Sequence, residues 1–134
     1  MRVITYGTFD TLHYGHILLL ERAKKLGDYL IVGISTDEFN EGKGKKANFD
    51  FDTRKALLQS LRCVDLIIPE HNWGQKREDI VKHKVDVFTI GDDWAGKFDD
   101  LSDICDVQYL TRTPNVSSTL LRQVLAQADK NGTS

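Results

Sequence analysis

The run YLIVGIS, at residues 29–35, constrains the fold more than any other part of the sequence. Seven consecutive uncharged residues, most of them aliphatic, are typical of a strand whose two faces are both covered. Strands of this kind occur mainly in parallel sheets that carry helices on their faces. The run therefore predicts an α/β domain.

Other short apolar runs alternate with segments of helical spacing along the whole chain. Strands are predicted at residues 3–6, 29–35, 64–69, 85–91 and 106–110. Helices are predicted at residues 16–26, ended by Gly27, at 52–61, capped by Asp52, at 75–83, and at 117–128, capped by Ser117 or Ser118. Residues 36–52 show no period and are expected to form a mobile surface loop. The crossovers are long enough for parallel pairing, so we predict a single doubly wound, Rossmann-like domain with a five-stranded parallel sheet and helices on both faces.

The size of the chain fits one domain, placed at residues 1–128, with a flexible tail at 129–134; the whole has 134 residues. Its net charge of −2 gives no field for capturing a nucleic-acid backbone, so no nucleic-acid partner is expected. Cys63 and Cys105 lack the spacing of a metal site and are expected to be free thiols in a reducing compartment. No apolar stretch is long enough for a signal peptide or a membrane span, which predicts a cytoplasmic protein.

Open parallel sheets bind ligands beyond the carboxyl ends of their strands. Polar clusters follow four of the predicted strands, at residues 7–16, 36–46, 91–94 and 111–119. These clusters are expected to surround the functional site.

The first cluster, GTFDTLHYGH, joins glycines to two histidines three residues apart. Gly7 and Gly15 allow the backbone to approach a ligand closely, and the helix that follows offers unpaired N–H groups. His13 and His16 are placed to donate hydrogen bonds to anionic oxygens. Read alone, they fit ordinary loop histidines better than phosphate ligands, and a metal site is disfavoured as well because no third ligand is evident.

The same stretch resembles the G-x-F-D-x-x-H-x-G-H signature of the nucleotidyltransferase superfamily, whose members join a nucleoside triphosphate to a phosphate or carboxylate acceptor. The resemblance implies that His13 and His16 bind the triphosphate during attack on its α-phosphorus. Asp10 is expected either to orient a metal ion or to brace the loop.

A second motif, RTPNVSST, places three hydroxyl residues at a predicted helix start. They suit phosphate oxygens, although simple helix capping would need only one of them. The motif resembles R-T-E-G-I-S-T-T of cytidylyltransferases, with Pro114 and Asn115 as departures, and also I-S-S-T-x-x-R of adenylyltransferases, so it leaves the base open. The carboxylates of GDDW, at residues 91–94, fit turn capping or a solvated loop as well as a ligand contact. The segment resembles the cytidylyltransferase pattern, and this resemblance suggests Asp93 as a nucleotide contact.

Lysines follow the second predicted strand, where a solvated surface is the ordinary interpretation. In cytidylyltransferases the corresponding loop closes on the substrates, with Lys43 toward the phosphorylated alcohol and Lys45 toward the nucleotide. RCVDLIIPE resembles a family segment near the dimer interface, with Arg62 directed at the site. NWGQKRED resembles the segment in which Lys76 would reach the acceptor phosphate.

The resemblance extends from residue 3 to about residue 125 and makes residues 1–128 a nucleotidyltransferase domain, most similar to the single-domain glycerol-3-phosphate cytidylyltransferases of teichoic acid (cell wall) synthesis. It implies transfer of CMP from CTP to glycerol 3-phosphate, a homodimer, and Mg²⁺ held mainly by the CTP phosphates rather than by a protein metal site. The alternatives are an adenylyltransferase acting on a small phosphorylated acceptor and a non-catalytic CTP-binding sensor. The implied catalytic residues are His13, His16, Lys43 and Arg112; the implied nucleotide contacts are Thr8, Phe9, Asp10, His13, Gly15, His16, Lys45, Asp93, Arg112, Thr113, Ser117, Ser118 and Thr119; the implied acceptor contacts are Lys43, Arg62 and Lys76.

Overall fold

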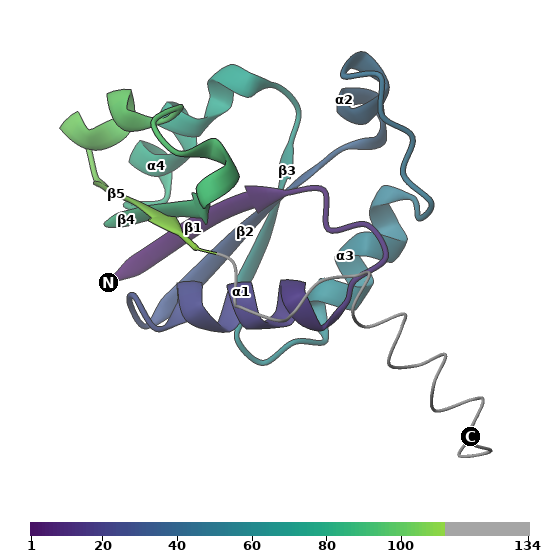
Figure 1. Ribbon diagram of the computed structural model, residues 1–134, viewed down its shortest axis with the longest axis horizontal. Helices are drawn as coiled ribbons and strands as arrows, with labels where there is room; N and C mark the ends of the chain where they lie inside the picture. The colour runs from purple at the N-terminus through teal and green to yellow at the C-terminus, as the bar shows by residue number, and fades with distance from the viewer. Residues whose placement is uncertain (112–134) are drawn as a thin grey trace.

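The computed structural model describes residues 1–111, and five parallel strands form one sheet in the order β3-β2-β1-β4-β5 (Figure 1). The chain adds strands on one side of β1 and then crosses to the other side, so the order reverses between β1 and β4. This arrangement confirms the predicted doubly wound sheet. The strands are β1 (Arg2–Gly7), β2 (Tyr29–Ser35), β3 (Leu66–Glu70), β4 (Val87–Gly91) and β5 (Asp106–Leu110).

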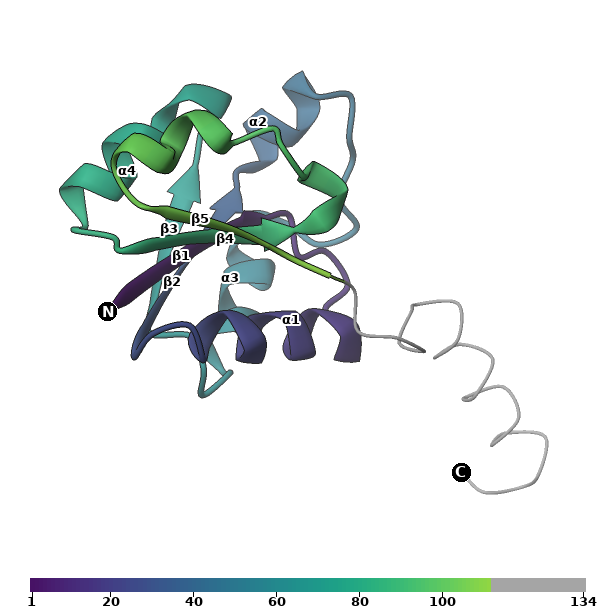
Figure 2. The ribbon, with the colours of Figure 1, turned by 60° about the vertical axis from the view of Figure 1, so that its left-hand side comes forward.

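Helices cover both faces of the sheet, as Figure 2 shows. One face carries α1 (Tyr14–Lys24) and α3 (Phe51–Gln59), and the other carries α4 (Lys76–Lys82). The short helix α2 (Asp37–Gly42) follows the carboxyl end of β2. Three 3₁₀ turns complete the described chain: η1 (Trp73–Gln75), η2 (Asp92–Trp94) and η3 (Asp99–Asp103).

The core divides into two clusters, one on each face of the sheet. Leu30, Val32 and Ile34 of β2 pack with α1 and α3, while Ile31 packs on the opposite face with Ile80 of α4. All of them are 1% exposed or less. The prediction of a strand covered on both faces is therefore confirmed, and burial on this scale is the main stabilising contribution to the fold.

The structure corrects the predicted starts of two helices. Helix α1 begins at Tyr14, two residues earlier than expected, with His13 as its N-cap. Helix α3 begins at Phe51 because the Asp50 carboxylate, not that of Asp52, accepts a hydrogen bond from the Thr53 N–H. In both cases the residue that accepts the orphan N–H group decides where the helix starts.

Two further expectations were wrong. The segment after β2 is not irregular throughout, because Thr36 caps α2 by accepting from the Phe39 N–H at 3.1 Å, and only residues 43–50 form the expected loop. Gly27 does not cap α1, whose C-cap is Lys25. The glycine is required instead by close packing, since a Cβ at Gly27 would lie 2.3 Å from the backbone oxygen of Met1.

Cys63 and Cys105 are free thiols, as expected, and burial raises the pKa of both. Within residues 1–111, the helices are all too short and too polar to cross a membrane. The predicted final helix at 117–128, the tail at 129–134 and the domain boundary between them lie outside the described residues.

Candidate active site

His13 and His16 close the amino end of α1 with a reciprocal pair of hydrogen bonds. Nδ1 of His13 accepts from the Gly15 N–H at 3.0 Å, and Nδ1 of His16 accepts from the His13 N–H at 3.2 Å. The two rings stack with their centroids 3.9 Å apart. Because Nδ1 is an acceptor in both residues, the proton of each neutral ring is on Nε2, and this atom becomes the side-chain donor.

His16 is uncharged near neutral pH. Burial lowers the pKa of His16 to about 4, and the neighbouring His13 contributes in the same direction. The edge of the Phe9 ring lies against His16, with a centroid separation of 5.6 Å. His16 therefore acts as a neutral hydrogen-bond donor rather than as a fixed cation or a ready proton acceptor.

The loop that leads into α1 is held in a strained conformation. Phe9 and Thr11 have positive φ angles of 51° and 46°, which few residues other than glycine adopt at low cost. Asp10 lies between them and accepts from the backbone N–H groups of Asn48 at 2.7 Å and Phe49 at 3.0 Å. These bonds hold the pKa of Asp10 below its usual value, although burial alone would raise it. Asp10 thus braces the loop.

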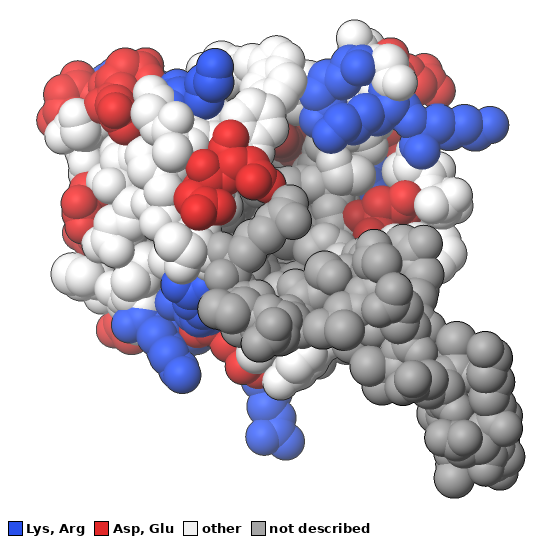
Figure 3. Space-filling view, viewed as in Figure 1, with Lys and Arg blue, Asp and Glu red and all other residues white. Residues whose placement is uncertain are grey.

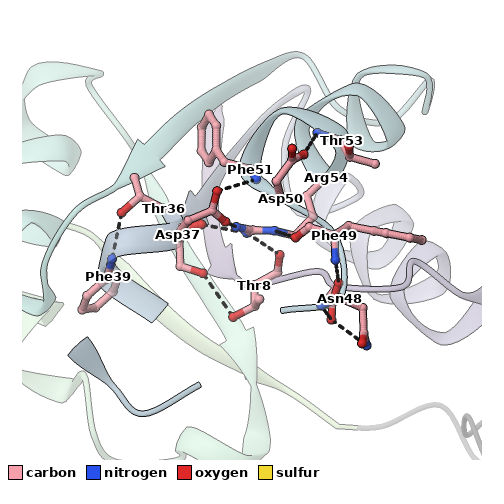
Figure 4. Close-up of polar contacts among 12 residues, drawn as sticks. Thr8, Thr36, Asp37, Phe39, Asn48, Phe49, Asp50, Phe51, Thr53 and Arg54 are labelled. Atoms are coloured by element: carbon pink, nitrogen blue, oxygen red, sulfur yellow. Dashed lines mark hydrogen bonds and ion pairs between the residues drawn. The ribbon is translucent and has the colours of Figure 1, made fainter. Parts of the chain in front are cut away.

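A buried arginine that the sequence did not reveal fixes the loops around this site (Figure 4). The Arg54 side chain of α3 is 0% exposed, and its guanidinium donates to the backbone oxygens of Thr8 and Ser35 at 3.1 and 2.7 Å. It also donates to the Phe49 oxygen at 3.0 Å and to the Asp37 carboxylate at 2.8 Å. One side chain therefore ties the carboxyl ends of β1 and β2 to the start of α2 and to the segment before α3.

A pocket opens beside the carboxyl ends of β1, β3 and β4, where the strand order predicts a ligand site. Thr8 lines this pocket, whereas the next residue, Phe9, contacts His16. The residues that follow β1 therefore adjoin both the pocket and the histidine pair. The lining residues are Tyr6, Gly7, Thr8, Lys43, Lys45, Glu70, Trp73, Lys76, Ile90, Trp94 and Phe98.

An ion pair lies in the wall of the pocket. Nζ of Lys76 is 2.6 Å from the Glu70 carboxylate, and both side chains are about 95% buried, with exposures of 4% and 5%. Beside it, the Tyr6 hydroxyl donates to Asp79 at 2.7 Å. Burial and this hydrogen bond raise the pKa of Tyr6, so its hydroxyl stays protonated.

Lysines give the mouth of the pocket a positive charge. Nζ of Lys43 lies 4.3 Å from the centre of the Phe39 ring and 5.2 Å from that of Trp73. Burial lowers the pKa of Lys43, and the charges of Lys45 and Lys76 lower it further. Basic side chains also gather on the surface over α2 and the segment that follows it (Figure 3). Such a surface suits an anionic ligand.

Most of the described residues that the sequence singled out surround the end of β1. Thr8, Lys43, Lys45 and Lys76 line the pocket, and Asp93 lies in η2, next to the lining residue Trp94. Five other predicted site residues lie in the loop after β1 and at the start of α1, around the histidine pair: Phe9, Asp10, His13, Gly15 and His16.

Arg62 is placed elsewhere. It is exposed and lies in the link between α3 and β3, at the amino end of β3. The pocket is at the carboxyl ends of the strands, so the structure does not bring Arg62 to the pocket within one chain. Arg112, Thr113, Ser117, Ser118 and Thr119 lie outside the described residues.

Several residues of the site region were not among the predicted site residues. They include the buried Arg54 and the lining residues Tyr6, Gly7, Glu70, Trp73, Ile90, Trp94 and Phe98. Arg54 precedes the buried Leu58 by four residues, so both lie on the core-facing side of α3, and this spacing was the available signal. Glu70 follows Pro69, where the strand was expected to end, but β3 continues through it. Within residues 1–111, no three metal-ligating side chains gather at one place, and Asp10 and Glu70 are engaged as described above.

Comparison with known proteins agrees with this geometry. A family profile described as Cytidylyltransferase-like matches residues 4–124. The glycerol-3-phosphate cytidylyltransferase of Bacillus subtilis is 59% identical over 93% of this chain and 97% of the relative. That of Staphylococcus aureus is 58% identical over 96% of this chain and 97% of the relative.

A solved structure shows the same fold. The lipopolysaccharide core biosynthesis protein of Thermoplasma volcanium superimposes with a TM-score of 0.71 at 35% identity, covering 84% of this chain and 96% of that one. The resemblance inferred from GTFDTLHYGH is thereby confirmed over nearly the whole chain. This chain belongs to the cytidylyltransferase-like family and is a nucleotidyltransferase.

Proposed function

We propose that the protein transfers CMP from CTP to glycerol 3-phosphate, giving CDP-glycerol and pyrophosphate. The observation that carries this proposal is a lysine-lined pocket beside a pair of histidines whose Nε2 atoms are donors, in a chain 59% identical to a relative named for this reaction. CDP-glycerol made in this way would serve teichoic acid synthesis in the cytoplasm.

The reaction needs an enzyme that brings two anions together. An oxygen of the acceptor phosphate attacks the α-phosphorus of CTP in line, the bond from the α-phosphorus to the bridging oxygen breaks, and pyrophosphate leaves with the electron pair. The acceptor phosphate is largely a dianion near neutral pH and needs no general base. Catalysis then consists of positioning and of stabilising charge that spreads over the phosphate oxygens.

The residues described above divide between these two tasks. His13 and the neutral His16 donate from Nε2 to the triphosphate, and Thr8, Phe9, Gly15 and Lys45 shape its site. Lys43 and Lys76 attract the acceptor. Asp93 contacts the base, and Arg112, Thr113, Ser117, Ser118 and Thr119 complete the phosphate site.

Mg²⁺ would enter with the nucleotide. The Asp10 carboxylate accepts backbone hydrogen bonds and Glu70 is paired with Lys76, so neither offers an unoccupied ligand set. The triphosphate oxygens and water would hold the ion, which supplies charge neutralisation.

We further propose a homodimer formed through residues 62–70. β3 is an edge strand of the sheet, and its side chains Leu66, Ile67 and Ile68 are only partly buried. A second copy would cover this edge, and Arg62 could then serve the site of its partner.

The deciding experiment offers CTP and ATP to the purified protein with glycerol 3-phosphate, phosphocholine and phosphoethanolamine, and measures pyrophosphate release and nucleotide products. We expect CDP-glycerol from CTP and glycerol 3-phosphate, at a kcat/KM far above every other pair. Turnover with ATP alone would make the protein an adenylyltransferase. Tight CTP binding without pyrophosphate from any acceptor would make it a sensor.

A further inference from the structure

The ammonium group of Lys76 is enclosed by aromatic rings. Nζ lies 4.8 Å from the ring centre of Tyr6 and 5.2 Å from those of Trp73 and Phe98. The side chain is only 4% exposed. Three aromatic faces at these distances make a favourable site for a cation.

A carboxylate completes this enclosure. Glu70 accepts a hydrogen bond from Nζ of Lys76 at 2.6 Å and is itself 5% exposed. Aromatic faces together with one carboxylate are the groups that bind an organic ammonium ligand. In this protein the ammonium group of Lys76 occupies the position that such a ligand would take. We call Tyr6, Glu70, Trp73 and Phe98 the cage.

A second lysine increases the positive charge next to the cage. Lys43 lies 5.2 Å from the centre of Trp73, the same ring that Lys76 contacts. Glu70 is the one carboxylate among the described residues that line the pocket, against three lysines. An acceptor with its own ammonium would have to enter beside these charges and would be repelled by them.

We propose that Lys76 is a specificity-determining residue: by filling the cage, it excludes phosphorylated alcohols that end in an ammonium group and admits those that end in hydroxyls. This inference rests on the proposed function and narrows its acceptor class. Glu70 holds Lys76 in place and offsets its charge. Lys76 therefore does more than attract the acceptor phosphate, because attraction alone would not distinguish one phosphorylated alcohol from another.

Lys76 has two proposed roles, attraction of the acceptor phosphate and exclusion of ammonium groups. The ratio of kcat/KM between two acceptors distinguishes them. Loss of a phosphate contact lowers kcat/KM for every acceptor by a similar factor, whereas an emptied cage changes the preference between them. In Lys76→Met, we expect kcat/KM for phosphocholine relative to glycerol 3-phosphate, both with CTP, to rise at least ~30-fold over the wild-type ratio. Calorimetry should also show phosphocholine binding to this variant and not to the wild type.

Lys45→Met is the matched control, because Lys45 also lines the pocket but lies over no aromatic ring within residues 1–111. Because Lys45 is assigned to the nucleotide, this variant should lower kcat/KM for both acceptors alike and leave their ratio within ~3-fold of wild type. In Lys76→Met the buried Glu70 carboxylate has lost its partner, which can prevent folding. The double variant Glu70→Gln/Lys76→Met removes both charges and allows the acceptor preference to be measured in that case. In the double variant, the ratio should still rise, by a smaller factor.

An unchanged ratio in the folded Lys76 variants, with no phosphocholine binding, would overturn the proposal. Failure of the proposed function is seen separately, as a wild-type protein that makes no CDP-glycerol from CTP and glycerol 3-phosphate.

Discussion

His13 and His16 stack with their ring centres 3.9 Å apart and together cap the first helix, each through Nδ1. The cap fixes the proton of both neutral rings on Nε2. The hydrogen bonds that close the helix thus leave two donors facing away from it, and these donors are available for the proposed binding of phosphate.

Replacing His16 should reduce turnover more than stability. His16→Ala is expected to lower kcat at least ~100-fold, the cost of losing a donor to the transition state. His16→Gln can still accept the His13 N–H and should restore the melting temperature but not kcat. His83→Ala is the control, since His83 lies at the carboxyl end of α4, away from the pocket. Near wild-type kcat in His16→Ala would remove this residue from catalysis.

Protein stability should depend on pH through His16. Its pKa is about 4 in the folded chain and 6.5 ordinarily, so between these values the unfolded chain binds a proton that the folded chain does not. The free energy of unfolding should therefore be highest above pH 6.5 and fall as the pH drops from 6.5 to 4. Urea unfolding across this range gives the free energy of unfolding of wild type and of His16→Gln. The difference between the two proteins should shrink as the pH falls toward 4. A difference independent of pH would contradict the assigned neutral state.

The acceptor should depend on Lys43 more than the nucleotide does. Lys43→Ala is expected to raise KM for glycerol 3-phosphate by at least ~10-fold and KM for CTP by a smaller factor, because one charge–phosphate contact is lost. Lys46→Ala, an exposed neighbour outside the pocket lining, should change neither constant by more than ~2-fold. Steady-state kinetics with each substrate varied in turn give the two KM values for the wild type and both variants. Equal increases in both KM values would remove Lys43 from the acceptor side.

Arg54 should be a major contributor to stability. Arg54→Met leaves the oxygens of Thr8 and Ser35 and the Asp37 carboxylate without this donor, and should lower the free energy of unfolding by about 3 kcal/mol or more. Arg77→Met breaks the exposed pair with Asp103, whose side chains are 45% and 62% exposed, and should lower the free energy of unfolding far less than Arg54→Met does. Denaturant titration compares the two, and similar losses would argue against the role of Arg54.

The sheet could be predicted because a strand that is buried on both faces has a continuous run of apolar residues. Residues 30–35 are all buried, and residues 30–34 among them carry no polar side chain, because helices cover both faces of the sheet at this strand. Helix α2 has no such apolar pattern, because its sequence DEFNEG is largely polar and its start depends on a cap from Thr36. A helix this short shows too little periodicity to be recognised.

The site was predictable where chemistry follows a fixed spacing, and hidden where it depends on tertiary contact. His13 and His16 belong to a local motif. Arg54 looks like an ordinary charged helix residue, because its partners lie up to 46 positions away in the chain. Glu70 likewise acquires its importance only when the turn at η1 brings Lys76 back to it.

The most direct test of the account is a crystal structure of the protein with CTP. The account predicts Nε2 of both His13 and His16 within about 3 Å of phosphate oxygens, with the stacked cap intact. A triphosphate bound away from the two imidazole rings would contradict it.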